Sequence, residues 1–267
     1  MKKYISFFRM RFIAGLQYRA AALAGIATQF AWGTLLILMY KAFYAADPEA
    51  FPMSFQALSS YMWLQQAFLA LFMTWFFEND IFRLIMDGGI AYEICRPINL
   101  YDMWFTRNMA NRLSKALLRC FPILIIAAFL PDPYGMRLPV NLSAAFWFLI
   151  TMILGYLIVV AFSMFVYIAT FFTLSPTGVK LAAVSAVEFL SGSVIPLPFL
   201  PDNIRRVLEL LPFASMQNVP LRIYSGDIVG GEIYYRFGLQ LFWVVILIFF
   251  GKLFMGKALK KAVVQGG

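Results

Sequence analysis

Residues 138–179 contain no charged side chain. This stretch is about twice as long as one crossing of a bilayer, which takes about 20 mostly apolar residues. The tetrapeptide Ser175-Pro176-Thr177-Gly178 supplies a Pro/Gly break inside it. We therefore expect two membrane crossings here, one over residues 144–172 and one that starts at residue 181.

Composition extends this prediction to the whole chain. Apolar side chains make up 62% of the residues and charged ones only 13%, against about 45–50% and 25% in soluble proteins. We expect a single all-α integral membrane domain over residues 1–267, which opens with an interfacial helix over residues 1–19. The six expected transmembrane helices cover residues 20–43, 58–77, 112–130, 144–172, 181–197 and 236–254.

The basic residues predict the orientation. If the N-terminus lies in the cytoplasm, sixteen of the 22 Lys and Arg residues fall on the inner side, as the positive-inside rule requires. Both termini are then cytoplasmic. The net charge of +9 reflects this topology, so we expect membrane lipid and no nucleic acid as a partner. Lys115 and Arg119 are expected to extend toward inner-leaflet phosphates.

The sequence argues against catalysis on this chain. It has no histidine, which excludes every mechanism that needs an imidazole base or ligand. Residues 251–258 read GKLFMGKA and nearly match a phosphate loop. However, Ala258 replaces the hydroxyl residue that binds magnesium, and the run before it is a membrane span. We expect no catalytic residue, metal or cofactor here.

Two segments are more than plain connections. Residues 78–111 mix acids, bases and aromatics between the breaks Gly88-Gly89 and Arg96-Pro97, which favours a docking surface for a cytoplasmic partner over a solvated loop. In residues 198–235, prolines end the fifth span early. We expect Asp202 to cap a short amphipathic helix that folds back into the outer leaflet or caps the fifth span. Its apolar face would hold Ile204, Val207, Leu208 and Leu211.

Glu188 is the only acid inside an expected span. A carboxylate in the membrane is costly and marks a functional site by default. It would face a translocation path or a subunit interface, or it would lie near the inner interface close to Lys180. The alternative function that it supports is an ion-coupled secondary carrier. Such carriers usually contain internal repeats, and the two halves of this sequence show no convincing one.

The layout resembles a known family. The resemblance rests on residues 192–201, on Leu211-Pro212-Phe213, on residues 220–226 and on the breaks in residues 78–111. In these features the chain resembles the permease subunits of ABC-2-type exporters. Within them it is similar to the small six-span bacterial permeases of the DUF990 type.

The resemblance implies a multi-pass permease in the bacterial plasma membrane. Two permease subunits, identical or similar, would form the translocation path, and separate ABC ATPase subunits would bind ATP and Mg. A coupling helix would lie at about residues 89–105. The residues implied in ATPase docking are Tyr92, Glu93, Arg96 and Asp102. The residues implied in the path, which spans two and five would line, are Phe68, Phe72, Phe76, Glu188 and Phe189.

Overall fold

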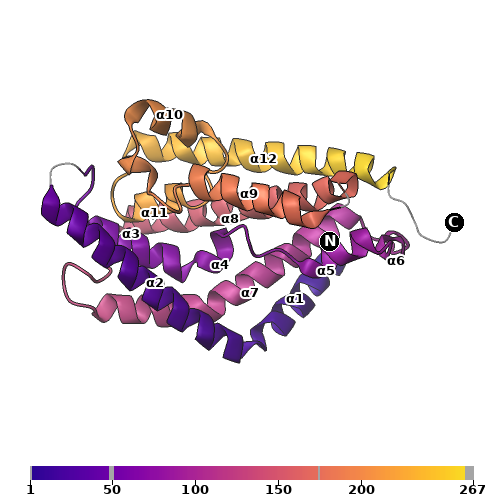
Figure 1. Cartoon of the computed structure of the whole chain (residues 1–267), viewed down its shortest axis with the longest axis horizontal. Coiled ribbons are helices and arrows are strands. Elements are labelled where there is room, and N and C mark those ends of the chain that lie inside the picture. Colours follow the sequence, from indigo (N-terminus) through magenta and orange to yellow (C-terminus); the bar gives the residue numbers. More distant parts are fainter. Residues whose placement is uncertain (1, 48–50, 174, 262–267) are drawn as a thin grey trace.

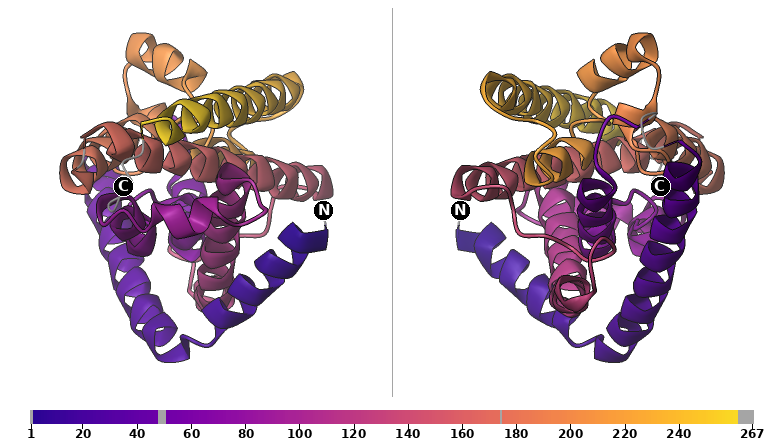
Figure 2. Two further views of the ribbon diagram at one scale, coloured as in Figure 1. Left: turned by 90° about the vertical axis from the view of Figure 1, so that its right-hand side faces the viewer. Right: turned by 90° about the vertical axis from the view of Figure 1, so that its left-hand side faces the viewer.

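The computed structural model describes residues 2–47, 51–173 and 175–261, and the regular structure in these ranges is entirely helical. Figures 1 and 2 show three tiers, with α10 and α12 at the top, α8, α9 and α11 in the middle, and a V of α1 and α2 at the bottom. The helices are α1 (Lys2–Leu16), α2 (Arg19–Ala46), α3 (Phe55–Ala67), α4 (Leu69–Phe72), α5 (Asn79–Met86), α6 (Ile90–Ile94), α7 (Leu100–Phe129), α8 (Leu142–Thr173), α9 (Pro176–Leu190), the 3-10 turn η2 (Leu197–Phe199), α10 (Asp202–Leu210), α11 (Asn218–Tyr224) and α12 (Gly231–Leu259).

Among the described residues, three helices are long and apolar enough to cross a membrane. They are α2, α8 and α12, which contain the expected first, fourth and sixth spans. The charge-free stretch divides as expected, because α8 ends at Thr173 and Pro176 begins α9. Proline suits this position, since the first helical turn does not need its missing N–H. An all-helical membrane protein is therefore confirmed.

The expected second and fifth spans are not single long helices. The second divides into α3 and α4, and Met73 after α4 is extended, so the prediction of one helix over residues 58–77 is wrong. The fifth, over residues 181–197, overlaps α9 only as far as Leu190, and the 15 residues of α9 extend about 22 Å at 1.5 Å per residue. The third expected span is the second half of α7, which begins twelve residues earlier than residue 112 at Leu100.

The expected coupling helix over residues 89–105 is also interrupted. Only Ile90–Ile94 forms α6, and a new helix, α7, starts at Leu100. Pro97 has no N–H to extend a helix, and the side chain of Asn99 accepts a hydrogen bond from the Asp102 amide at 3.1 Å. This N-cap fixes the start of α7 after the break.

The outer amphipathic helix is present as α10, and only its N-cap differs from the prediction. Pro201, and not Asp202, is the N-cap residue. Ile204 and Val207 are 52% and 61% exposed, whereas Glu209 is only 8% exposed. The polar side of α10 therefore faces the protein, and part of its apolar side faces outward, where lipid would cover it.

Glu209 lies between two arginines from other elements. It forms ion pairs with Arg222 of α11 and Arg236 of α12. Asp227 and Glu232 supply a second acid to each arginine. Burial by itself would raise the pKa of Glu209, but the two guanidinium groups outweigh burial and bring that pKa below its ordinary value. These ion pairs thus hold the polar side of α10 against the protein.

A glycine allows the segment before α11 to reach the middle tier. A Cβ atom on Gly155 of α8 would lie 1.9 Å from the carbonyl oxygen of Met216. Only glycine therefore permits this backbone approach. It places α11, all of whose residues are buried, directly against α8.

Candidate functional site

Helices α5 and α6 lie at the right-hand end of the molecule in Figure 1, which we call the α6 end. The amphipathic α5 buries Ile81, Phe82 and Ile85. The ring of Phe82 lies 5.0 Å from that of Tyr167 in α8. The Tyr167 hydroxyl in turn accepts a hydrogen bond from the Glu78 amide at 2.8 Å. The short helices are therefore attached to the central helix α8.

The four expected docking residues differ in accessibility. Tyr92 is 80% exposed, whereas the side chain of Glu93 is 11% exposed and pairs with Arg96 at 3.3 Å. Asp102 pairs with Lys252 of α12 at 2.8 Å. Tyr92 and Arg96 are therefore free to contact a partner, while Glu93 and Asp102 stabilise the α6 end internally.

Two further exposed apolar residues lie on α5 and α6. Met86 at the end of α5 is 47% exposed and Ile94 in α6 is 45% exposed. Neither residue was predicted from the sequence to lie in a docking surface. Their signal was weak, because isolated apolar residues are common in a chain of this composition. We call Met86, Tyr92, Ile94 and Arg96 the α6 surface.

Arg112 of α7 stabilises the non-helical backbone between α4 and α5, where the expected second span is interrupted. It is 2% exposed, and its guanidinium donates to the carbonyl oxygens of Met73 at 2.6 Å and of Leu71 and Phe76 at 3.3 Å. It also donates to Asn108 Oδ1 at 2.6 Å and Ser163 Oγ at 3.1 Å. Non-helical backbone in a membrane protein needs such partners. Arg112 thus replaces the hydrogen bonds that the helix break removes.

A cavity of about 570 Å³ lies next to this break. Its lining comes from α2, α3, α4 and the chain after it, from Arg119 of α7, and from the end of α9 with the residues that follow it. The side chain of Gln29 is buried, and among the described residues neither its amide nitrogen nor its amide oxygen has a partner. Gln65 donates to the Ser193 carbonyl at 2.8 Å, while its own oxygen is unpaired. We call this space the amide cavity.

The amide cavity brings together two of the five expected path residues. Phe76 and Glu188 line it. Phe72 is 2% exposed in the core, and Phe68 packs on Phe148 with ring centroids 6.1 Å apart. Phe189 is 73% exposed on the outside of α9. The structure therefore places Phe76 and Glu188 at one site and the other three elsewhere.

The near match to a phosphate loop has a packing explanation. Residues 251–258 lie inside α12, where the backbone N–H groups bond within the helix. A Cβ atom on Gly251 would lie 2.6 Å from the hydroxyl oxygen of Tyr101 in α7. Gly251 therefore allows α12 to approach α7 closely, and the second glycine, Gly256, has open space around it.

Arg112 and the two glutamines of the amide cavity, Gln29 and Gln65, were missed by sequence reasoning. One signal was available for the first: Arg112, Lys115 and Arg119 follow the spacing i, i+3, i+7, which places them on one face of a helix. Nothing local indicated Gln29, because an isolated glutamine in an apolar helix is also common at a packing contact.

Comparison with known proteins gave one result that covers most of the chain. A family model described as ABC-2 family transporter protein matches residues 30–266. A search of the curated proteins found no match.

Proposed function

The chain belongs to the ABC-2 family of transporter proteins, and from this membership we propose that it is the permease subunit of an ATP-driven exporter. It would work with a second permease subunit, of the same or a similar chain, and with separate ATP-binding subunits. Members of this family are transmembrane components that normally partner with ABC ATPases. ATP hydrolysis would then take place on the partner.

The α6 surface supports this proposal most directly. Its exposed aromatic and apolar groups lie on two short helices at one end of the bundle (Figure 1). Exposed tyrosine with an arginine nearby is typical of interface hot spots. Because α5 packs against α8 through Phe82 and Tyr167, a movement of this surface would reach the middle tier. ATP binding by the partner could thus select one arrangement of the permease pair.

We further propose that the chain crosses the membrane six times, with both termini in the cytoplasm. α2, α8 and α12 supply three crossings. The others would be α3 with α4 and the extended chain after it, the second half of α7, and α9 with the prolines that follow it. Arg112 would make the broken crossing tolerable, since it satisfies three of its carbonyl groups.

The amide cavity is the proposed part of the translocation path on this subunit. Unpaired amide groups and a carboxylate beside aromatic rings can bind cargo that has both polar and apolar parts. The contributing residues would be Gln29, Gln65, Phe76 and Glu188. Phe68 and Phe72 would pack against the residues that line the cavity without lining it themselves.

Replacement of Tyr92 by serine tests the docking role of the α6 surface. We expect the affinity for a co-expressed ATP-binding subunit from the same genome to fall about 30-fold, because a tyrosine hot spot contributes about 2 kcal/mol. The measurement is titration of that purified subunit against the purified chain in detergent. Tyr235→Ser is the matched control, because Tyr235 is 55% exposed on α12, away from α6.

Equal affinities for the wild-type chain and Tyr92→Ser would contradict docking through this surface. Glu93→Arg gives a second comparison. Glu93 is mostly buried against Arg96, so this reversal should lower the stability of the α6 end as well as partner affinity. Tyr92→Ser should leave the thermal midpoint unchanged, which separates contact from folding.

A further inference from the structure

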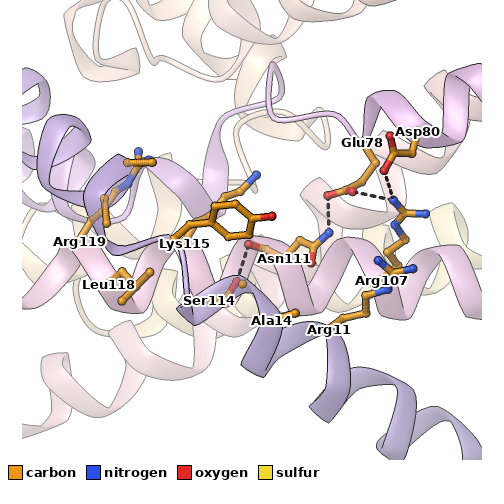
Figure 3. Close-up of a pocket in the computed structure, with 14 residues that line it drawn as sticks. Arg11, Ala14, Glu78, Asp80, Arg107, Asn111, Ser114, Lys115, Leu118 and Arg119 are labelled. Carbon is orange, nitrogen blue, oxygen red and sulfur yellow. Dashed lines mark hydrogen bonds and ion pairs between the residues drawn. The ribbon is translucent and has the colours of Figure 1, made fainter.

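A second cavity, of about 400 Å³, lies between α1, the start of α2 and the middle of α7. Figure 3 shows Arg11, Arg107, Lys115 and Arg119 around it, together with Glu78 and Asp80. We call it the basic cavity. Helix α1 meets α7 closely here, because a Cβ atom on Gly15 would lie 2.1 Å from the hydroxyl oxygen of Ser114.

The two acids of the basic cavity are already neutralised within the protein. Arg107 pairs with Glu78 at 3.2 Å and with Asp80 at 3.0 Å. Asp80 also pairs with Arg83, and Asn111 donates a hydrogen bond to Glu78. The contacts of Arg107 with both acids and of Asn111 with Glu78 are drawn as dashed lines on the right of Figure 3. Neither acid is therefore available to neutralise the remaining bases.

The other three bases have no such partner. Among the described residues, Lys115 and Arg119 form no hydrogen bond and no ion pair, and the Nε atoms of Arg11 and Arg119 are buried without a partner. Lys115 lies over the Phe76 ring at 5.3 Å. The Arg119 guanidinium lies against Gly25, where a Cβ atom would be 2.5 Å from its Cζ. Partly buried cations without counter-charges indicate a missing anion.

The surroundings fit an anion that carries a hydrocarbon tail. Leu118 lines the cavity, and Ile125 lies two turns further along the same side of α7 and is 57% exposed. Tyr18, at the α1–α2 turn, lines the cavity and is 72% exposed, which suits a headgroup boundary. Basic pockets between membrane helices on the cytoplasmic side are typical sites for anionic headgroups.

We propose that the basic cavity binds the phosphate of an anionic phospholipid headgroup. Lys115 and Arg119 contact the phosphate oxygens from α7, and Arg11 contacts them from α1. The lipid thus connects α1 to α7 at a contact that includes Gly15 and Ser114. This site does not depend on transport, so its test is independent of the exporter proposal.

The test uses the purified full chain in detergent, titrated with phosphatidylglycerol or phosphatidylcholine and read by native mass spectrometry. We expect the wild-type chain to bind phosphatidylglycerol preferentially. Lys115→Gln with Arg119→Gln should weaken this binding about 30-fold, since each base near an anionic headgroup contributes about fivefold. Arg11→Gln should weaken it about fivefold, and α1 has no buried residue whose loss would unfold the chain.

Lys257→Gln with Lys260→Gln is the matched control. It removes the same charge from exposed sites near the end of α12 and should leave phosphatidylglycerol binding unchanged. Equal binding of both lipids, or equal losses in the control and the cavity variants, would overturn the proposal. Inorganic phosphate or glycerol 3-phosphate that competes as well as the lipid would overturn the assignment to a phospholipid.

Discussion

Replacement of Arg112 by methionine is expected to lower the free energy of unfolding by roughly 3 kcal/mol. The guanidinium satisfies the carbonyl oxygens of Leu71 in the last turn of α4 and of Met73 and Phe76 in the non-helical chain after it. Each buried acceptor without a partner costs about 1–3 kcal/mol. Removal of a buried charge returns part of that cost, so the net loss is below the sum.

The midpoint of thermal unfolding in a mild detergent measures this effect. A loss of this size corresponds to a fall of about 6–12 °C for a chain of this length. Arg112→Lys should lie between the wild type and Arg112→Met, because an ammonium group cannot reach all of the acceptors. Arg206→Met removes an exposed arginine and should leave the midpoint unchanged. An Arg112→Met midpoint equal to that of the wild type would contradict the role assigned to Arg112.

Replacement of Glu209 by glutamine is expected to cost roughly 2–3 kcal/mol and to release α10 from the bundle. The side chains of Arg222 and Arg236 are only 8% and 9% exposed. Loss of one acid from a buried charge cluster costs about 3–5 kcal/mol. The effect is smaller here because Asp227 and Glu232 remain.

The same cluster predicts a pH dependence. The two arginines bring the pKa of Glu209 below its ordinary value of 4.5 in spite of burial. Glu209 therefore contributes its full stability above pH 4.5, and this contribution disappears as the pH falls through the lower pKa of the folded state. Protease cleavage within residues 201–211 reports the release of α10.

We expect cleavage of the wild-type chain to increase below pH 4.5, and cleavage of Glu209→Gln to be fast at neutral pH. Glu232→Gln is the control, because the Glu232 side chain is 43% exposed and should matter less. Slow cleavage of Glu209→Gln at neutral pH would contradict the docking of α10 through this carboxylate.

The cluster also illustrates how far the sequence can predict this fold. The charge-free stretch and its proline predict α8, α9 and the break between them, because both signals are local. The apolar spacing predicts α10 but does not show which residues its polar side contacts. The inward face depends on Arg222 and Arg236, which lie 13 and 27 residues further along the chain, and periodicity does not contain such distant partners.

The candidate sites depend even more on distant contacts. No local residue explains the break after α4 as clearly as Pro176 explains the break before α9. The residue that stabilises it is Arg112, about 40 residues away along the chain. The amide cavity is lined by residues from α2, α3, the chain after α4 and the end of α9, so Phe76 and Glu188 could be selected by residue type but not placed together. Likewise, Glu93 has the charge expected of a docking residue, but its pairing with Arg96 removes it from the surface.

The central claim is that this chain supplies a membrane path while its energy source lies on another chain. The most direct measurement is ATP hydrolysis and proton flux in proteoliposomes that contain the purified chain alone or together with an ATP-binding subunit. We predict neither activity with the chain alone, and ATP hydrolysis once the subunit is added. ATP hydrolysis by the chain alone, or a proton flux by the chain alone that Glu188→Gln abolishes, would contradict the claim.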